Sequence, residues 1–308
     1  MIRRSGLPFL CYVKISITMN NRLALGTVQF GLPYGIANAN GQVGHDEAAA
    51  ILAHAESVGL DLLDTAVAYG EAERRLGEIG IDHWRVVSKL PAVPQGCANI
   101  SAWVEKSVDD SLERLGIEAL YGLLLHRPQQ LLGVHGEALY WACVALKNQR
   151  KVEKIGISVY GPDELEAIVS HFEMDLVQAP FNVLDRRLAT SNWLTRLHDS
   201  GIEVHTRSVF LQGLLLMDET SRPAQFDSWQ PLWTTWHRWL DENELSPLQA
   251  SLGFVLSHPE IDQVVVGVDS LAQLESILAN IETSAGVVPQ SLISNDPNLI
   301  NPSRWTVQ

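Results

Sequence analysis

The sequence predicts a single-domain (β/α)₈ TIM barrel, and three observations support this fold class. Short apolar segments alternate with longer helix-like segments along most of the chain, and eight such pairs can be counted. Strands separated by helices must pair in parallel through right-handed crossovers, and eight such units can close on themselves. The chain has 308 residues, 46% of them hydrophobic, and no linker or low-complexity segment divides it.

The expected elements follow one another in a regular order. The expected strands are residues 23–27, 61–64, 85–89, 121–125, 154–158, 175–179, 203–207 and 263–266. The expected helices are residues 46–58, 72–79, 102–115 and 137–149, a helix opened by Gly161-Pro162, residues 191–200, a helix from Ser246-Pro247 to before Pro259, and one ending near Ile281. For the helix at 102–115, we expect Ser101 to cap the N-terminus and Gly116 to end it.

An open, doubly wound sheet is the alternative fold. Its dinucleotide-binding form carries G-x-G-x-x-G after the first strand, whereas this chain reads GTVQFG there. The absence of that motif favours the barrel.

Composition narrows the possible partners and the cellular compartment. The formal net charge of −14 disfavours a nucleic acid or an anionic membrane as a partner. The three cysteines are widely spaced and form no C-x-x-C pair, which fits a reducing cytoplasm. No run of eighteen apolar residues is present, so we expect no membrane span.

Residues 1–21 precede the first expected strand. Lys14 interrupts their apolar run and no small-x-small cleavage site follows, which disfavours a signal peptide. We therefore divide the chain into an N-terminal extension at 1–21, either disordered or the result of a misassigned start, and a barrel at 22–308.

Three consecutive expected strands end with an ionisable residue, and a tyrosine follows the first of them. Asp64, Lys89 and His126 mark the ends of the second, third and fourth strands, and Tyr69 lies five residues after Asp64. Because the C-terminal ends of barrel strands face one active site, we expect these side chains to meet there. Taken singly, each has a structural explanation: a turn cap, a loop aromatic, a solvent-exposed lysine and a hydrogen-bonded histidine. Four such coincidences at matched strand ends favour a catalytic site.

The residue types indicate separate roles at a carbonyl group. A tyrosine hydroxyl is a poor acid at neutral pH, but an ammonium about 4 Å away favours the phenolate by roughly 4 kcal/mol at an effective dielectric constant of ~20. We expect Lys89 to supply this charge and Asp64 to hold Lys89 through an ion pair. We expect His126 to orient the carbonyl oxygen and Tyr69 to protonate it. None of these groups can supply a hydride, so a cofactor must do so.

The loops after the last two strands offer a place for that cofactor. Ser208 and the segment 211–213 follow the seventh strand, and the segment 267–270 follows the eighth. These loops form the usual phosphate region of the fold, where backbone N–H groups at the start of the last helix can meet a pyrophosphate. Ordinary loop structure is the alternative explanation.

The chain resembles the aldo-keto reductase family from about Arg22 to Ile281. The motifs that carry the resemblance are, in order, LGTVQFG, DTAVAYGEAE, VVSKLP, LLLHRP, IGISVY, VQAPFNVLDR, SVFLQGLL and VVVGVDSLAQLE. The resemblance implies that Tyr69 is the general acid, that Lys89 and Asp64 tune it, and that His126 orients the carbonyl. It implies that Ser158 and Gln178 hold the nicotinamide carboxamide. The other cofactor-binding residues that it implies are Gly26, Thr27, Arg207, Ser208, Leu211, Gly213, Gly267, Ser270 and Gln273.

The resemblance also implies the reaction and the partners. We expect an NAD(P)H-dependent reduction of a small-molecule carbonyl by a monomer or small homo-oligomer, without a metal. The alternative is a nucleotide-binding barrel that acts as a sensor or accessory subunit. With no H-x-H after the first strand, a metal-dependent barrel hydrolase is disfavoured.

Two positions depart from the family pattern. Arg207 stands where many relatives place a tyrosine that stacks on nicotinamide, and a guanidinium can also stack. Where relatives often bind the adenosine 2′-phosphate with lysine or arginine, this chain carries Asp269. We therefore expect relaxed cofactor choice, with NADP(H) favoured slightly over NAD(H).

Substrate specificity is expected to depend on three segments around the pocket. These are residues 129–136, the Trp-rich connection after the seventh strand, and the tail at 287–308. Trp229, Trp233 and Trp236 have helical spacing, which favours packing on the barrel. We expect His205 to be a core or rim residue. The segment YGIANANGQV resembles bacterial members tied to surface-sugar metabolism, which suggests a sugar-like carbonyl.

Overall fold

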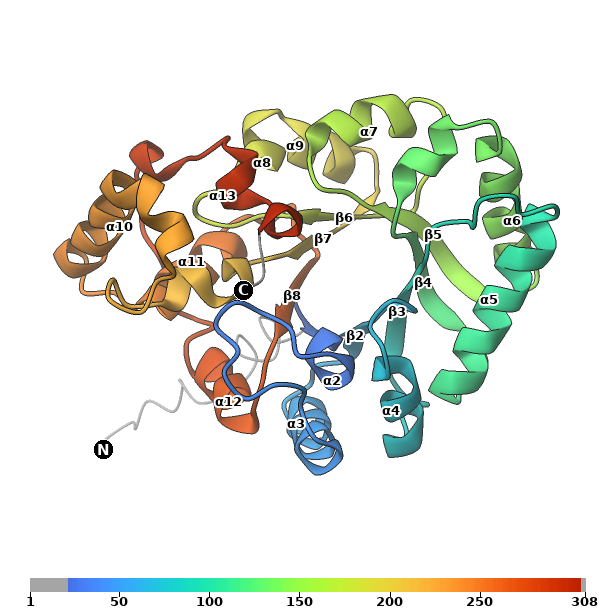
Figure 1. The fold of residues 1–308 in the computed structure, drawn as a ribbon, viewed down its shortest axis with the longest axis horizontal. Helices are drawn as coiled ribbons and strands as arrows, with labels where there is room; N and C mark the ends of the chain where they lie inside the picture. The colour runs from blue at the N-terminus through green and yellow to red at the C-terminus, as the bar shows by residue number, and fades with distance from the viewer. Residues whose placement is uncertain (1–21, 306–308) are drawn as a thin grey trace, which may run out of the picture.

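The computed structural model describes residues 22–305 and shows a closed barrel of parallel strands in the order β1 to β8, surrounded by helices (Figure 1). β1 pairs with both β2 and β8, which closes the sheet. The prediction of a (β/α)₈ TIM barrel is confirmed. The extension predicted at 1–21 lies outside the described residues.

The strands match the expected segments to within one or two residues at each end. They are β1 (Leu23–Gly26), β2 (Leu62–Asp64), β3 (Arg85–Leu90), β4 (Leu120–Leu125), β5 (Val152–Ser158), β6 (Leu176–Pro180), β7 (Glu203–Arg207) and β8 (Gln263–Gly267).

The helices form the outer layer. The α-helices are α2 (Val28–Gly31), α3 (His45–Ser57), α4 (Ala72–Ile79), α5 (Ile100–Leu115), α6 (Gly136–Asn148), α7 (Pro162–Val169), α8 (Arg187–Thr190), α9 (Trp193–Asp199), α10 (Gln230–Glu242), α11 (Pro247–Leu256), α12 (Leu271–Ala279) and α13 (Pro297–Ile300). Short 3₁₀ segments include η1 (Pro128–Leu132), η2 (Leu211–Leu216) and η3 (Ala224–Trp229). No helix within residues 22–305 has the length and hydrophobicity needed to cross a bilayer.

Local signals set most helix ends, but the expected cap of α5 is wrong. Asn99, not Ser101, caps this helix, because its side-chain oxygen accepts a hydrogen bond from the Ala102 N–H at 3.0 Å. An asparagine side chain fits this role well, and the helix therefore begins two residues earlier than expected. Gly116 ends α5 in the left-handed conformation, with φ at +67°, as the sequence predicts.

The Trp-rich connection is largely the helix α10. Trp233 and Trp236 are fully buried on one face of it, which confirms that they pack onto the body of the protein. Each indole N–H donates to a backbone carbonyl, that of Phe226 for Trp233 and that of Leu215 for Trp236. This face holds the connection after β7 against the barrel.

An apolar layer fills the middle of the barrel interior. It consists of Ala24, Leu62, Val87, Leu124, Leu176 and Val265. Gly156 makes room for it, because an added Cβ would lie 1.9 Å from the Leu176 carbonyl oxygen. A second and larger apolar cluster lies between the sheet and the helices. The polar interior side chains are therefore confined to the two ends of the barrel.

Candidate active site

Lys89 is the centre of a buried polar cluster at the C-terminal ends of the strands. Its ammonium donates hydrogen bonds to the Asp64 Oδ1 at 2.6 Å and to the Thr65 carbonyl at 2.9 Å. The Tyr69 hydroxyl lies 3.4 Å from the same nitrogen. The Lys89 side chain is 1% exposed and that of Asp64 is 6% exposed, so water screens this ion pair very little.

Burial and neighbouring charge shift the pKa of Lys89 in opposite directions. Burial by itself lowers the pKa of the ammonium, but Asp64 and the Tyr69 oxygen together hold that pKa above its ordinary value. Lys89 therefore keeps its positive charge beside the Tyr69 hydroxyl at neutral pH.

Local backbone structure presents Tyr69 to this cluster. In a tight turn after β2, the Tyr69 N–H donates a hydrogen bond to the Ala66 carbonyl, and Gly70 follows with φ at +56°. Gly31 at the end of α2 permits a close approach, because a Cβ there would lie 1.7 Å from the Tyr69 carbonyl oxygen. The glycines of the LGTVQFG and DTAVAYGEAE motifs thus set the position of the phenol.

His126 follows β4 and faces Tyr69 edge-on. The two ring centroids are 6.0 Å apart and the rings are nearly perpendicular. Burial lowers the pKa of the imidazole to about 4, and the positive charges of Lys89 and Arg207 add to this effect. His126 is therefore neutral above about pH 5 and offers one ring N–H as a hydrogen-bond donor.

Gln178 and Ser158 belong to the same cluster. The Gln178 amide donates to the second carboxylate oxygen of Asp64 at 2.6 Å, and the Ser158 hydroxyl donates to the Gln178 amide oxygen at 3.1 Å. Sequence reasoning assigned both residues to the cofactor and did not predict this contact. The contact leaves Asp64 with one oxygen on Lys89 and the other on Gln178.

A cavity of about 630 Å³ opens above the cluster. The residues predicted for the site that line it are Gly26, Thr27, Asp64, Tyr69, His126, Ser158, Gln178, Arg207, Ser208, Gly213, Gly267 and Gln273. Lys89 lies behind this surface. Leu211 does not line the cavity because its side chain is fully buried in the core. Ser270 does not line it either, because its hydroxyl caps α12 by accepting the Gln273 N–H.

The prediction for the walls of the cavity is right for one of the three segments. The connection after β7 lines the cavity through Phe210, Gln212, Gly213 and Leu216, although its tryptophans do not. No lining residue comes from 129–136 or from the described part of the tail, and the chain after β1 forms another wall. Residues that sequence reasoning missed include Gln29, Tyr34, Asn38, Arg127 and Tyr160. Arg127 lies within the motif LLLHRP and Tyr160 ends the motif IGISVY, so motif position could have identified these two.

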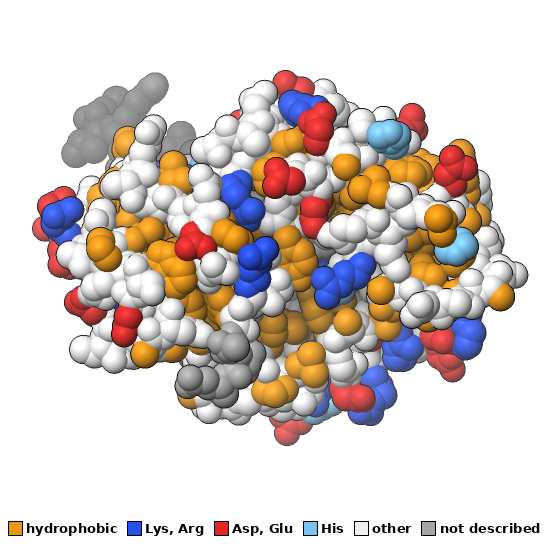
Figure 2. Space-filling view, turned by 45° about the horizontal axis from the view of Figure 1, so that its top comes forward, with side chains coloured by type: hydrophobic (Ala, Val, Ile, Leu, Met, Phe, Trp, Pro, Cys, Tyr) orange, Lys and Arg blue, Asp and Glu red, His pale blue; other side chains and the backbone are white. Residues whose placement is uncertain are grey.

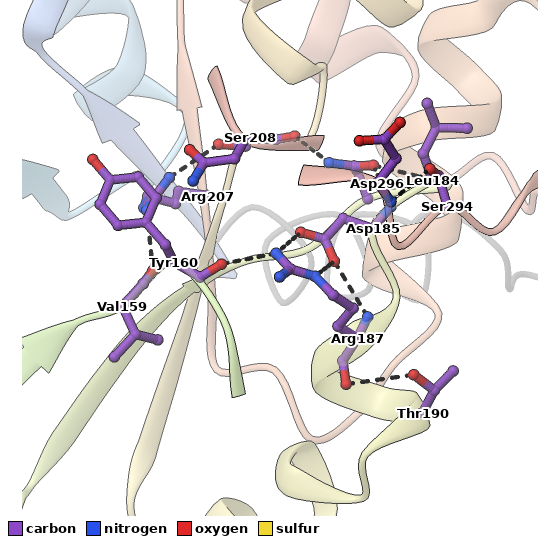
Figure 3. A network of polar contacts seen from close by, with 12 residues as sticks. Val159, Tyr160, Leu184, Asp185, Arg187, Thr190, Arg207, Ser208, Ser294 and Asp296 are labelled. Atoms are coloured by element: carbon purple, nitrogen blue, oxygen red, sulfur yellow. Dashed lines mark hydrogen bonds and ion pairs between the residues drawn. The ribbon is translucent and has the colours of Figure 1, made fainter. Parts of the chain in front are cut away.

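One wall of the cavity is held by a chain of arginine contacts (Figure 3). Arg207 donates to the Val159 carbonyl at 3.0 Å, and its guanidinium lies 4.9 Å from the centre of the Tyr160 ring. Arg187 in turn donates to the Tyr160 carbonyl and forms an ion pair with buried Asp185, each at 2.8 Å. These contacts fix the ends of β5, β6 and β7 relative to one another.

The lining of the cavity fits a dinucleotide. The Gln29 side-chain oxygen is buried and has no hydrogen-bond partner among residues 22–305. Gly267 makes room for the Gln29 side chain, because a Cβ at position 267 would lie 2.6 Å from the Gln29 amide nitrogen. Neutral amides and hydroxyls on Asn38, Ser208 and Gln212 suit ribose and carboxamide groups.

Three N–H groups around the start of α12 already bind side chains. The Leu271 N–H donates to the Glu47 carboxylate at 2.7 Å, and the Asp269 N–H donates to the Gln273 side chain at 2.8 Å. The Gln273 N–H donates to the Ser270 hydroxyl. A pyrophosphate that used these three N–H groups would have to displace those side chains.

Comparison with known proteins identifies the family. The model of the Aldo/keto reductase family matches residues 22–285. The chain belongs to this family. A D-threo-aldose 1-dehydrogenase of a Pseudomonas species is 27% identical over 311 residues, covering 87% of this chain and 93% of the relative.

Solved structures agree with the fold of this aldo-keto reductase. The holo form of an aldo-keto reductase from Bacillus halodurans superposes with a TM-score of 0.70 at 19% identity, covering 88% of this chain and 90% of that one. A glycerol dehydrogenase from Gluconobacter oxydans superposes with a TM-score of 0.65 at 18% identity, covering 85% and 86%. The resemblance in the sequence motifs is thus confirmed, and the chain is an oxidoreductase of a family that generally uses NAD(P)H on small-molecule carbonyls.

Proposed function

We propose that this aldo-keto reductase reduces an aldehyde or ketone to an alcohol with NAD(P)H and that Tyr69 is the proton donor. One observation carries the proposal. A buried ammonium, that of Lys89, lies 3.4 Å from the hydroxyl of Tyr69, which lines the same cavity as neutral His126. This arrangement supports the proposal that a proton donor and a hydrogen-bond donor act together on one substrate oxygen.

The side chains have distinct roles in this proposal. When bound in the cavity, the nucleotide would supply the hydride for the carbonyl carbon. Tyr69 donates its proton to the carbonyl oxygen, which takes the electron pair of the broken π bond. Lys89 stabilises the phenolate that remains, and His126 donates a hydrogen bond that orients the oxygen. Asp64 keeps Lys89 charged and in place.

The adenosine end supports relaxed cofactor choice. Asp269 is half-buried, accepts a hydrogen bond from the Asn38 amide at 3.2 Å, and has a pKa that burial raises. A 2′-phosphate placed near this carboxylate would be repelled. We propose that NADP(H) and NAD(H) both serve, with NADP(H) slightly favoured. A thousandfold preference for NADPH in kcat/KM would refute this.

Two relatives support a polyhydroxylated, sugar-like substrate. One is named for an aldose and the other for glycerol. The polar amides that line the cavity can bind hydroxyl groups.

Loss of NADPH absorbance with a panel of aldehydes and aldoses tests the proposal. We expect turnover in the native protein and a loss of about 10²–10⁴-fold in kcat in Tyr69→Phe, which removes only the hydroxyl. Nucleotide fluorescence on mixing measures binding separately. Binding without turnover of any carbonyl would favour the sensor or accessory role, and full turnover in Tyr69→Phe would exclude the assigned acid.

A further inference from the structure

Two arginines line the cavity without a carboxylate partner. Arg127 and Arg207 both contribute to its wall, and neither forms an ion pair with any acid in the part of the chain that the structure describes. Arg187, close by, is by contrast paired with Asp185. An arginine left unpaired beside a cavity keeps its donors available for a bound anion.

Arg207 is held rigidly. Besides the Val159 carbonyl, it donates to the Ser208 hydroxyl at 3.3 Å, and its guanidinium stacks against Tyr160 (Figure 3). Tyr160 is itself fixed, because its N–H donates to Glu164 at 2.7 Å and its carbonyl accepts from Arg187. These contacts leave part of the guanidinium free, in a fixed orientation, so that an anion binds with little ordering cost.

The Arg127 side chain lacks such contacts with other described residues. It follows His126 directly, is exposed, and makes no side-chain hydrogen bond to any residue in the range 22–305. The side chain is therefore free to close on a ligand from the mouth of the cavity.

Both guanidiniums line the same cavity as His126, and Arg127 follows His126 directly in the chain. Burial, Lys89, Arg207 and Arg127 all lower the pKa of the imidazole, against the opposing effect of Asp64. Asp64 is the carboxylate that lines this end, and it is bonded to Lys89 and Gln178. The chain carries a net charge of −14, and on the face that Figure 2 shows, basic side chains lie near the middle with acidic and hydrophobic ones around them. The potential around His126 is therefore positive.

We propose that the physiological substrate is a carbonyl compound that carries a carboxylate, which Arg207 binds and Arg127 covers. This inference rests on the proposed function, since it places the carbonyl oxygen on Tyr69 and His126. Two guanidiniums can bind a carboxylate through charge-assisted hydrogen bonds, and this would orient the substrate for protonation.

Matched substrates test the inference. 4-Carboxybenzaldehyde and methyl 4-formylbenzoate share the aldehyde and the ring, and they differ in the negative charge. We expect the native protein to prefer the carboxylate by at least about tenfold in kcat/KM, with the preference falling as salt is raised. Arg207→Gln and Arg127→Gln should each reduce this ratio, and Arg207→Lys should restore part of it. Arg150→Gln, an exposed arginine at the C-terminal end of α6, should leave the ratio unchanged.

A binding measurement separates this inference from the reaction. The affinities of 4-(hydroxymethyl)benzoate and of its methyl ester are measured by tryptophan fluorescence with NADP⁺ present, in all of these proteins. Tighter binding of the carboxylate that is lost in the two glutamine variants supports the inference even where no aldehyde is reduced. Equal affinity for acid and ester overturns it even where neutral aldehydes turn over. Variants that weaken NADP⁺ binding but keep the carboxylate preference also overturn it, because the arginines would then serve the nucleotide.

Discussion

The barrel contains the same four kinds of ionisable group, a carboxylate, a phenol, an ammonium and an imidazole, at both of its ends. The upper cluster, at the C-terminal ends of the strands, consists of Asp64, Tyr69, Lys89 and His126. The lower cluster, nearer the N-terminal ends, consists of Tyr121, Lys154, Glu203 and His205. The apolar layer around Leu124 and Leu176 fills the interior between them. The two clusters show how one set of groups yields either a reactive site or a structural one.

In the lower cluster, the carboxylate is the centre. Glu203 accepts a hydrogen bond from the Tyr121 hydroxyl at 2.8 Å, contacts the His205 imidazole at 2.6 Å and is ion-paired to Lys154. Burial raises the pKa of the Tyr121 hydroxyl, and acceptance by Glu203 raises it further against the opposing effect of Lys154. A tyrosine bonded to a carboxylate keeps its proton.

In the upper cluster, the ammonium is the centre. Lys89 lies between Asp64 and Tyr69, so the Tyr69 oxygen meets a positive charge and no carboxylate. The Tyr121 oxygen, by contrast, meets both the Lys154 ammonium at 2.7 Å and the Glu203 carboxylate. Tyr69 and His126 also face an open cavity, whereas Tyr121 and His205 do not line it. The identity of the central group and access to a ligand therefore separate the two clusters.

Removing each lysine gives the largest expected contrast. Lys89→Met leaves Asp64 buried without its ammonium, and we expect a loss of about 3–5 kcal/mol in the free energy of unfolding and of about 10²–10⁴ in kcat. Lys154→Met should cost about 2–3 kcal/mol, because Glu203 keeps two other partners, and should leave kcat unchanged. Urea unfolding and NADPH oxidation measure the two effects. A Lys154→Met protein that is folded but inactive would contradict the assignment of a structural role to the lower cluster.

Glu203→Gln tests the centre of the lower cluster through pH. Burial opposes ionisation of Glu203, but bonds from His205, Lys154 and Tyr121 lower its pKa to about 2. Because this is below the unfolded value near 4.5, the carboxylate stabilises the fold above pH 4.5 and loses that effect as pH falls towards 2. We expect Glu203→Gln to be less stable by about 3 kcal/mol at pH 7 and by much less near pH 2.5. Urea midpoints at several pH values measure this, and a difference that does not depend on pH would contradict it.

The sequence predicts the upper cluster better than the lower one. Asp64, Lys89 and His126 stand at strand ends, and the fold brings all such ends to one rim. The residues of the lower cluster lie within strands or at their starts. At such positions the sequence pattern suggests that polar side chains face solvent. His205 was expected in the core or at the rim, and it is fully buried. Which of these side chains face inward follows from barrel closure, which local patterns do not encode.

The cavity walls show a similar limit. Motif order indicates most of the lining, but Leu211 turns into the core and Ser270 is used as a helix cap. In the chain after β1, the Tyr34 hydroxyl accepts a hydrogen bond from the Gln212 amide, and the Asn38 amide donates one to the Asp269 carboxylate. Contacts between segments that are far apart in sequence carry no local signal, so these walls could not be predicted.

His126→Asn tests the upper cluster through pH in a different range. The folded pKa of about 4 lies below the ordinary value of 6.5, so the unfolded chain takes up a proton first as pH falls. The histidine therefore destabilises the fold by about 2 kcal/mol at pH 5 relative to pH 8, and an asparagine removes this penalty. We expect the loss of stability between pH 8 and pH 5 to be smaller in the variant by that amount. An equal loss in both proteins would show that the imidazole is protonated in the folded state.

The two tyrosines should give the smallest effect on stability and the clearest separation of roles. Tyr121→Phe removes the hydrogen bond to Glu203 and the one from Lys154, but leaves the ion pair between those two residues, so we expect a loss of about 1 kcal/mol and an unchanged kcat. Within residues 22–305, the Tyr69 hydroxyl has one side-chain hydrogen-bond partner, Lys89 at 3.4 Å, so Tyr69→Phe should change stability less than Tyr121→Phe does. Measuring urea unfolding and kcat on both variants compares the effect of each hydroxyl on stability with its effect on turnover. If Tyr121→Phe slowed turnover without loss of stability, the hydroxyl at the lower end would be coupled to the reaction and the two clusters would not be independent.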